Sequence, residues 1–275
     1  MSNGSPPLRK LRILIAEDTP ANYRILEKVL TGRGHEVVVA RNGKEALYCI
    51  FYGHFDVVVM DVQMPLLDGF EVARAVRQQE QSHTEYTPIV ALTVHEGDAD
   101  RARCLEAGMD EYLSKPLDAG QLIHTVEHLA NGRRPSQPGS SEDGHRARRT
   151  SPTWTDKNIV DFDGCMRRLN GDLELFREFV EIFHEDSPGL VEAIRRGVAL
   201  RDSVQLARAA HSLKGLTSNF GARGAVEAAK QLEEIGEQHR WADADAALEL
   251  LDQSLARLYT ELETFRHAST APTTS

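Results

Sequence analysis

Short runs of apolar residues alternate with amphipathic stretches over the first 130 residues of the chain. The apolar runs predict five buried strands, at 11–16, 37–40, 57–60, 89–92 and 112–113. The stretches that follow them have apolar positions at helical spacing, at 21–30, 44–51, 69–77, 98–107 and 118–128. Runs made almost entirely of Val, Ile and Leu indicate strands that are buried on both faces, and such strands need helices on both sides of a parallel sheet. The pattern therefore predicts an α/β doubly wound five-stranded parallel sheet.

The C-terminal part of the chain shows helical spacing throughout. It predicts helices at 172–183, 189–200, 203–219, 224–237 and 242–266. Apolar residues on the third of these recur every three or four positions, at Leu206, Ala209, Ala210, Leu213, Leu216, Thr217 and Phe220. This spacing gives the helix one inward face, as a bundle requires. The C-terminal part therefore predicts an all-α four-helix-bundle domain.

Pro, Gly, Ser and Arg dominate the segment between the two parts, and apolar periodicity stops there, which is typical of a flexible linker. We expect a sheet domain at 8–130, a flexible linker at 131–155, a helical domain at 156–268 and a disordered tail at 269–275. The basic run within the linker is interpreted as a solvated segment.

Composition narrows the range of partners. The length of 275 residues and the 41% of hydrophobic residues suit two domains that each bury a core. The net charge of −10 comprises −6 over residues 1–130, +3 over 131–155 and −7 over 156–275. Two acidic domains argue against a nucleic-acid partner, because an acidic surface repels a phosphate backbone. The three cysteines are far apart and have no Cys-x-x-Cys spacing, so neither a disulfide framework nor a zinc site is expected.

No apolar run approaches the roughly 18 residues that a membrane helix needs, and the N-terminus has no apolar signal core. We therefore expect a cytoplasmic protein without a membrane span. The sequence also has no Gly-x-x-x-x-Gly-Lys-Ser/Thr phosphate loop. Any phosphate that the chain handles should arrive already activated on another molecule.

Residues that suit phosphoryl chemistry follow four of the predicted strands. Glu17 and Asp18 follow the first strand, Asp61 the third, Thr93 the fourth and Lys115 the fifth. Ligands of an open parallel sheet bind at the carboxyl ends of its strands. Carboxylates that meet there repel one another unless a cation lies between them, and oxygen ligands of this kind suit Mg²⁺. A lysine and a hydroxyl beside that ion can bind the other oxygens of a transferring phosphoryl group.

The segments around these residues resemble the receiver domain of two-component response regulators, particularly receivers attached to hybrid kinases. They are Leu-Ile-Ala-Glu-Asp-Thr-Pro-Ala-Asn, Val-Val-Met-Asp-Val-Gln-Met-Pro-Leu-Leu-Asp-Gly, Ile-Val-Ala-Leu-Thr and Tyr-Leu-Ser-Lys-Pro-Leu, and the resemblance covers about residues 8–130. It implies a flavodoxin-like fold in which Asp61 accepts the phosphoryl group. It also implies that Asp18, Asp61 and the Gln63 carbonyl hold Mg²⁺, while Glu17 assists through water.

The same resemblance implies that Lys115 pairs with the phosphoryl oxygens and that Thr93 and Tyr112 form the switch pair of the family. Val94 departs from the family pattern, which has Ala or Gly after the switch threonine. Its bulk beside the phosphoryl pocket is expected to change the rate at which the receiver gains or loses phosphate.

A second candidate site lies on the third predicted helix of the C-terminal domain. His211, Lys214, Gly215 and Ser218 are at i, i+3, i+4 and i+7, and they form a stripe beside the apolar face. An exposed neutral imidazole is a competent nucleophile near neutral pH. Lys214 can neutralise the charge of an incoming phosphoryl group. Gly215, which costs about 1 kcal/mol in a helix interior, clears space beside the ring.

The segment Ala-His-Ser-Leu-Lys-Gly-Leu-Thr-Ser-Asn-Phe-Gly-Ala resembles the active helix of histidine phosphotransfer (Hpt) domains. The resemblance covers about residues 159–265 and implies that His211 is phosphorylated and that Lys214 and Gly215 support it. His184, in His-Glu-Asp-Ser-Pro, superficially resembles the histidine box of sensor kinases. No ATP-binding domain follows it, so we interpret this segment as the end of the second helix of an Hpt domain.

The two resemblances together predict a phosphorelay protein that receives a phosphoryl group on Asp61 from a partner phosphohistidine and exchanges it through His211. We expect a carrier with Mg²⁺-dependent self-phosphorylation and dephosphorylation and without a kinase catalytic domain. The expected partners are a histidine kinase or hybrid kinase as phosphodonor and response-regulator receiver domains as acceptors.

Three alternatives compete with this interpretation. The chain can be the detached C-terminal part of a hybrid sensor kinase, or a docking and scaffold module that is regulated by phosphorylation, and both alternatives stay open. A phosphatase of the haloacid dehalogenase type needs Asp-x-Asp after its nucleophile strand. Asp61-Val62-Gln63 and Asp18-Thr19-Pro20 both fail that test.

Overall fold

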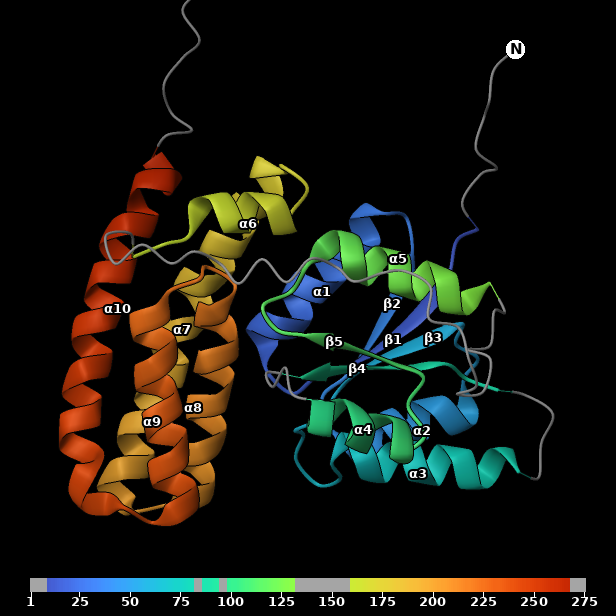
Figure 1. Cartoon of the computed structure of the whole chain (residues 1–275), viewed down its shortest axis with the longest axis horizontal. Helices are drawn as coiled ribbons and strands as arrows, with labels where there is room; N and C mark the ends of the chain where they lie inside the picture. The colour runs from blue at the N-terminus through green and yellow to red at the C-terminus, as the bar shows by residue number, and fades with distance from the viewer. Residues whose placement is uncertain (1–8, 82–85, 94–97, 132–158, 268–275) are drawn as a thin grey trace, which may run out of the picture. The chain divides into compact units, whose positions relative to one another are not determined.

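A computed structural model of the chain describes residues 9–81, 86–93, 98–131 and 159–267. Val94, residues 132–155 of the expected linker and the expected tail at 269–275 lie outside the described residues. The chain forms two compact units, one built around a β-sheet and one built from helices, and each is described by itself (Figure 1).

The N-terminal unit contains a sheet of five parallel strands in the order β2-β1-β3-β4-β5. The strands are β1 (Arg12–Ala16), β2 (Glu36–Ala40), β3 (Val57–Asp61), β4 (Ile89–Thr93) and β5 (Glu111–Ser114). The predicted doubly wound sheet is confirmed. The strand order reverses between β1 and β3, and in such sheets ligands bind at this switch point, outside the carboxyl ends of the strands.

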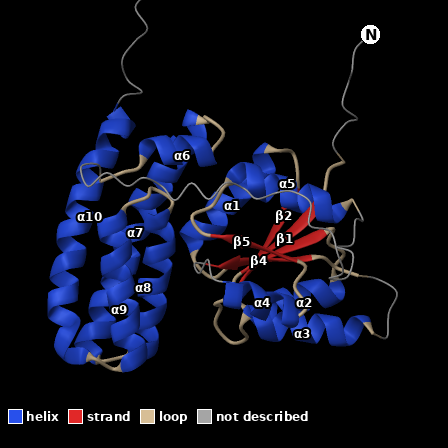
Figure 2. Cartoon of the chain, viewed as in Figure 1, coloured by secondary structure: helices blue, strands red, loops and turns tan. Residues whose placement is uncertain are grey.

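Each strand is followed by a helix: α1 (Pro20–Gly32), α2 (Gly43–Tyr52), α3 (Gly69–Glu80), α4 (Asp98–Glu106) and α5 (Ala119–Ala130). Helices α1 and α5 cover one face of the sheet, and α2, α3 and α4 cover the other, as the blue helices and red strands of Figure 2 show. Every residue of β3 and β4 is buried. Burial on both faces explains why these strands are apolar until their last residues, Asp61 and Thr93.

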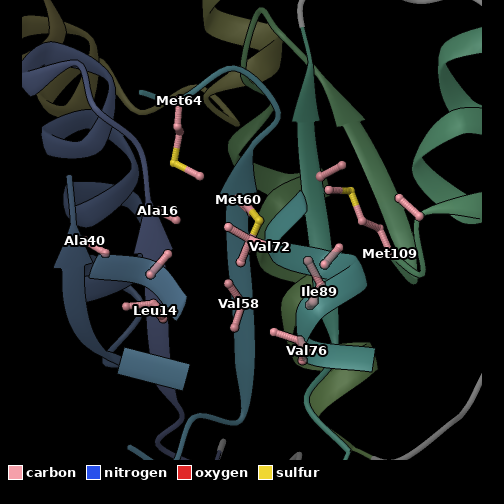
Figure 3. Close-up of a cluster of buried hydrophobic side chains, with 14 of the residues drawn as sticks. Leu14, Ala16, Ala40, Val58, Met60, Met64, Val72, Val76, Ile89 and Met109 are labelled. Atoms are coloured by element: carbon pink, nitrogen blue, oxygen red, sulfur yellow. The ribbon is translucent and has the colours of Figure 1, made fainter. Parts of the chain in front are cut away.

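Alternate residues of the central strands build the core on the α3 side, because successive side chains of a strand point to opposite faces. This core cluster includes Leu14, Val58, Met60, Ile89, Val72 and Val76 (Figure 3). Burying one such side chain contributes about 1.5–3 kcal/mol. The cluster therefore fixes the strands that end in Asp61 and Thr93 against α3.

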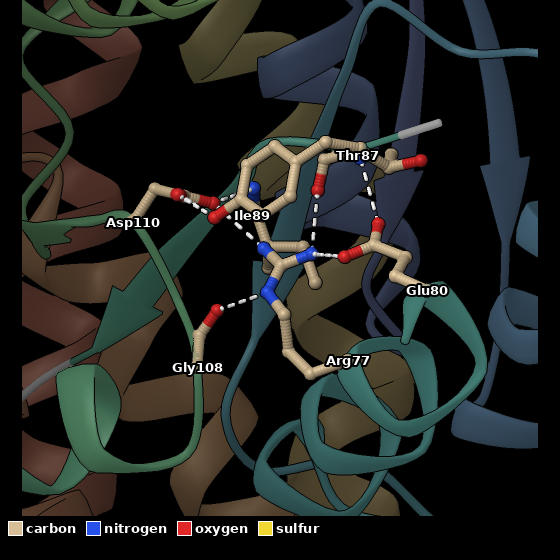
Figure 4. Close-up of polar contacts among 7 residues, drawn as sticks. Arg77, Glu80, Thr87, Ile89, Gly108 and Asp110 are labelled. Atoms are coloured by element: carbon tan, nitrogen blue, oxygen red, sulfur yellow. Dashed lines mark hydrogen bonds and ion pairs between the residues drawn. The ribbon is translucent and has the colours of Figure 1, made fainter. Parts of the chain in front are cut away.

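A polar network centred on Arg77 of α3 fixes the opposite end of the sheet, where β4 and β5 begin (Figure 4). Its guanidinium group donates from Nε to the Gly108 carbonyl at 2.7 Å and from Nη1 to Glu80 Oε2 at 2.6 Å. Its Nη2 donates to Asp110 Oδ2 at 2.8 Å, and the same carboxylate accepts the backbone N–H of Ile89 at 2.8 Å. One side chain thus connects α3 with the first residues of two strands.

The C-terminal unit contains α6 (Phe162–Arg168), α7 (Leu173–Leu200), α8 (Ser203–Ser218), α9 (Arg223–Gln238) and α10 (Ala244–His267), with a 3-10 turn at Trp241–Asp243. The last four helices contact one another in the cyclic order α7, α8, α9, α10, so the predicted four-helix bundle is confirmed. Helix α6, which packs against α7, was not predicted, because its seven residues are too few to show a clear apolar period.

The prediction of separate helices at 172–183 and 189–200 is wrong, because α7 runs from Leu173 to Leu200 with Pro188 inside it. A proline cannot donate to the carbonyl four residues earlier and normally ends or kinks a helix. Here the Ser187 hydroxyl bonds to the Phe183 carbonyl and lies 2.7 Å from the Tyr259 hydroxyl of α10. Packing of α7 against α8 and α10 outweighs the local preference.

None of the helices within the described ranges is both long and apolar enough to cross a membrane.

Candidate functional site

The register of the sheet brings the carboxylates of β1 and β3 to one edge. Ala16 pairs with Met60, so Glu17 and Asp61 are the next residues on two adjacent strands, whose axes lie about 4.8 Å apart. Glu17 and Asp61 are buried, whereas Asp18 is half-buried. Two buried carboxylates and a more accessible third one therefore gather where the strand order reverses.

Strands β4 and β5 bring a hydroxyl and an ammonium group to the same edge. Thr93, the last residue of β4, is buried and pairs with Ser114 of β5, and Lys115 follows directly. The peptide bond between Lys115 and Pro116 is cis. From β1 to β5 the edge carries Glu17 and Asp18, then Asp61, then Thr93, then Lys115.

Local hydrogen bonds orient the carboxylates. Asp61 Oδ1 accepts the backbone N–H of Gln63 at 3.0 Å. Thr19 donates its N–H to Glu17 Oε1 at 3.3 Å and its hydroxyl to Asp18 Oδ1 at 3.4 Å. Thr19 was not predicted as a site residue, although its place between the acidic pair and the first helix is a usable signal.

The described residues contain no group of three or more His, Cys, Asp or Glu side chains arranged to hold a metal ion. The donors nevertheless fit Mg²⁺, which usually binds through one or two carboxylates and keeps several waters. Two buried carboxylates on adjacent strands destabilise each other when both are ionised, and a divalent cation removes that repulsion. Asp18, Asp61 and the Gln63 carbonyl suit such an ion, and its binding stays a prediction.

The loop that follows Asp61 is held closely at both ends. Gly69 donates its N–H to the Val62 carbonyl at 2.9 Å, and a Cβ atom on Gly69 would lie 2.6 Å from the Asp61 carbonyl oxygen. A Cβ atom on Gly43 would lie 2.1 Å from the carbonyl oxygen of Leu67. Both positions require glycine because backbone approaches backbone there.

The predicted switch residue Tyr112 is half-buried in β5 and packs against the core cluster on the α3 side. The guanidinium carbon of Arg101 in α4 lies 5.6 Å from the centre of its ring, within the range of a cation–π contact. A rotation of Tyr112 coupled to Thr93 stays a prediction.

The second candidate site joins α8 to α9. His211 Nδ1 lies 2.6 Å from Glu233 Oε1, and Lys214 Nζ donates to Glu233 Oε2. An ionised carboxylate only accepts hydrogen bonds, so we assign the imidazole proton to Nδ1. Nε2 then keeps the lone pair that a nucleophile needs.

Glu233 is buried, and its charge is stabilised by its two partners. Burial alone would raise the pKa of Glu233, but the hydrogen bonds and charges of His211 and Lys214 outweigh burial and lower it. The carboxylate is therefore ionised at neutral pH. Glu233 was not predicted as a site residue. A signal exists, because a glutamate four residues after Ala229 and one after Leu232 lies on the buried side of α9.

The other predicted residues of the helical domain lie on two different helices. Gly215 is in α8, one turn beyond His211. His184 is in α7, where its Nε2 lies 3.8 Å from Glu263 Oε1 and its ring centre 5.4 Å from that of Tyr259. His184 is therefore part of the packing between α7 and α10.

Two protein families match the two units in order. Residues 13–127 match the response regulator receiver domain, and residues 178–261 match the Hpt domain. Neither family is a kinase catalytic domain.

Curated relatives of the chain include sensor proteins, one of which is named as a histidine kinase. The sensor histidine kinase GacS of Pseudomonas protegens is 32% identical over 258 residues, which are 93% of this chain and 27% of the relative. The sensor protein EvgS of Escherichia coli is 28% identical over 228 residues, 82% of this chain and 17% of the relative. The chain thus spans about a quarter or less of the length of these relatives.

Solved structures match the N-terminal unit. The receiver domain of a sensor histidine kinase from Pseudomonas aeruginosa, with magnesium coordinated in its active site cleft, is 33% identical, with a TM-score of 0.41 over 44% of this chain and 98% of that one. A Francisella receiver domain is 30% identical, with a TM-score of 0.42, and covers 44% of this chain and 98% of its own. The two family matches place the chain among the two-component phosphorelay proteins, as a response regulator receiver domain followed by an Hpt domain.

Proposed function

We propose that this chain carries phosphoryl groups in a phosphorelay, on Asp61 of the receiver domain and on His211 of the Hpt domain. The observation that carries the proposal is the pairing of two sites in one chain. Buried Asp61 ends a central strand at the switch point of the sheet, and His211 is hydrogen-bonded to a buried, ionised carboxylate. A carboxylate and an imidazole are both nucleophiles that form covalent phosphoryl intermediates.

At the receiver, a carboxylate oxygen of Asp61 attacks the phosphorus of a partner's phosphohistidine. The O–P bond forms as the N–P bond breaks, and the imidazole leaves with the electron pair and takes a proton from water. The N–H of Gln63 keeps the attacking carboxylate in place. Asp18, Asp61 and the Gln63 carbonyl would hold Mg²⁺, which when bound would neutralise charge on the phosphoryl oxygens.

The remaining receiver residues take the roles that the family resemblance implies. Lys115 pairs with one phosphoryl oxygen and Thr93 donates its hydroxyl to another, at the place where negative charge develops. Glu17 assists the metal site through water. Tyr112 responds to the state of Thr93.

At the Hpt domain, Nε2 of His211 attacks the phosphorus of an aspartyl phosphate, and the carboxylate leaves with the electron pair of the broken O–P bond. Positive charge develops on the ring, and Glu233, whose Oε1 accepts a hydrogen bond from Nδ1 at 2.6 Å, stabilises this charge and fixes the tautomer. Lys214 is held by the same carboxylate and can turn to the phosphoryl group from one helical turn away. Gly215 leaves space beside the ring.

The donor in this scheme is a histidine kinase or hybrid kinase, and the acceptors are receiver domains. Because the curated relatives, among them a sensor histidine kinase, are much longer than this chain, the alternative that it corresponds to part of a hybrid sensor kinase stays open. A docking module without phosphoryl chemistry is less well supported, since Asp61, Lys115 and His211 are all in place.

The proposal is tested by labelling the full chain with two small donors, radiolabelled acetyl phosphate and radiolabelled phosphoramidate. An aspartyl phosphate is lost in alkali, whereas a phosphohistidine survives alkali and is lost in acid. We expect acetyl phosphate to give alkali-labile label that requires Mg²⁺, and phosphoramidate to give acid-labile label that His211→Gln removes. His184→Gln is the matched control, and loss of the acid-labile label in that variant would show that the wrong histidine was assigned.

A further inference from the structure

Two histidines of α5, His124 and His128, lie one helical turn apart. They are at i and i+4 of the helix, and both are exposed. Their rings are stacked, with the ring centres 6.0 Å apart and an angle of 8° between the planes. Residues at i and i+4 share one face of a helix, so both imidazoles are open to solvent on the same face of α5.

The fold makes no use of the nitrogen atoms of this pair. With the residues that the structure describes, neither imidazole forms a hydrogen bond or an ion pair, and each ring contacts the other. The buried histidines differ in this respect, since His35 accepts the N–H of Leu11 and His211 is hydrogen-bonded to Glu233. The ligand atoms of His124 and His128 are therefore available to an ion from solution.

The spacing of the two rings suits a shared metal ion. An imidazole nitrogen binds Zn²⁺ at about 2.0–2.1 Å, so each ring centre lies roughly 3.2 Å from the ion and two rings on one ion have centres at most about 6.4 Å apart. The observed 6.0 Å is within that limit, and small rotations of two exposed side chains bring one nitrogen of each to the ion. Histidines at i and i+4 on one helix face are the ligand pair of helical zinc sites.

The electrostatic surroundings of the pair favour a cation. His128 is in the last turn of α5, where the dipole of the helix presents its negative end. Residues 1–130 carry a net charge of −6, which raises the local concentration of cations.

The pair is separate from the phosphoryl site. Glu127, next to His128, has its Oε1 3.0 Å from Arg33 Nε and 3.4 Å from His35 Nε2, and these two residues come just before β2. This part of α5 therefore lies at the amino ends of the strands, whereas Asp61 ends β3 at the carboxyl edge. A strand of five residues is about 16 Å long, so roughly that distance separates the two places.

We propose that His124 and His128 bind one divalent transition-metal ion of the class that prefers imidazole, represented by Zn²⁺. Mg²⁺ does not fit this pair, because it prefers oxygen ligands. The two histidines supply two ligands, and water fills the remaining coordination positions. Binding connects two turns of α5 in the folded state and so stabilises the receiver domain. This site goes beyond the proposed carrier function and takes no part in phosphoryl transfer.

The test titrates the full chain, purified without a histidine tag, with Zn²⁺ in an excess of Mg²⁺, which occupies oxygen-ligand sites such as that at Asp61. Calorimetry should show a binding event that His124→Ala and His128→Ala each weaken by at least about tenfold, a loss that removal of even an outer partner of a metal ligand reaches. Zn²⁺ should also raise the unfolding temperature of the receiver domain in the parent but not in either variant. With Cu²⁺ in place of Zn²⁺, electron paramagnetic resonance should show coupling to two imidazole nitrogens that either substitution removes.

The matched control keeps two histidines on the exposed side of α5 but separates them. Gln121→His combined with His124→Ala places them at i and i+7, about 10.5 Å apart along the helix, which is too far to share an ion. This variant should bind Zn²⁺ as weakly as His124→Ala. His239→Asn removes an exposed histidine of the Hpt domain and should leave the affinity unchanged.

Parental Zn²⁺ affinity in His124→Ala, or in the variant with separated histidines, would overturn the inference, because scattered surface histidines would then account for binding. Labelling of each variant by acetyl phosphate should match that of the parent, since the pair lies at the other edge of the sheet. A loss of this labelling would contradict a site that is separate from Asp61.

Discussion

The Asp61 site and the His211 site differ in how the negative charge of their buried carboxylates is balanced. The receiver site gathers two buried carboxylates and a half-buried one from two adjacent strands, and their mutual repulsion favours a cation from solution. In the Hpt domain one buried carboxylate, Glu233, lies between an imidazole that donates a hydrogen bond to it and an ammonium group that neutralises its charge. The comparison teaches that the carboxylates of the first site suit a cation, whereas the carboxylate of the second already has cationic and hydrogen-bonding partners within its own domain.

The first prediction concerns the rate at which His211 is labelled, and it tests whether the imidazole needs Glu233 as its partner. Glu233→Ala should slow the labelling of His211 by phosphoramidate about 100-fold, because the ring loses the group that fixes its tautomer and stabilises its charge. Glu233→Gln keeps a hydrogen-bond acceptor without the charge, so we expect an intermediate loss of about tenfold. Initial labelling rates measured from pH 5 to 9 check both values.

Glu234→Ala is the matched control on the same helix. The Glu234 carboxylate is 40% exposed and lies 3.9 Å from Lys230 and from Arg240, and its loss should leave the labelling rate unchanged. A parental rate in Glu233→Ala, with the fold checked by circular dichroism, would show that the imidazole needs no carboxylate partner.

The second prediction compares ion pairs of the two units. Arg77→Met should destabilise the receiver domain by about 2–3 kcal/mol, because it leaves Asp110, whose side chain is 5% exposed, without its guanidinium partner. Tyr86 shares that carboxylate, and its pKa is raised by burial and by its hydrogen bond to Asp110. Thermal unfolding of the full chain, followed by calorimetry, measures the shift of the receiver transition.

Arg195→Met is the control for an exposed pair, since Arg195 and Asp252 lie 2.6 Å apart but are 48% and 42% exposed. We expect less than about 0.5 kcal/mol from its loss. Equal effects of the two substitutions would mean that the burial of the Arg77 network contributes nothing to stability.

The third prediction concerns acid stability. The pKa of Glu233 is lowered in the folded state from its ordinary value of 4.5, so its stabilising contribution is present above pH 4.5 and is lost as the pH falls through the folded pKa. Unfolding of the Hpt domain followed from pH 6 to pH 3 should show this loss, and Glu233→Gln should show a smaller one. The same pH dependence in both proteins would mean that other carboxylates account for it.

The smallest expected effect is at Val94, which lies outside the described residues. Val94→Ala should change the rates of receiver labelling by acetyl phosphate and of label decay by a few-fold, because it removes two methyl groups beside Thr93. Identical rates in variant and parent would show that the phosphoryl pocket accommodates valine.

Residues at the ends of strands could be found from sequence because each follows a recognisable apolar run. Asp61 and Lys115 are examples, and the parallel register places them at one edge without further information. Glu233 could not be found in this way, since it is 22 residues from His211 and only the packing of α8 on α9 joins them. Pro188 misled the helix prediction for a related reason, because packing of the bundle outweighed a strong local signal.

The measurement that tests the central claim most directly is Mg²⁺-dependent labelling of Asp61→Asn by acetyl phosphate. Asp68→Asn is the control in the same loop, since Asp68 caps α3 with its carboxylate and asparagine caps a helix about as well. We expect alkali-labile labelling to fall to background in Asp61→Asn and to stay within about twofold of the parent in Asp68→Asn. Undiminished labelling of Asp61→Asn, or its loss in Asp68→Asn alone, would contradict the assignment of Asp61 as the phosphoryl acceptor.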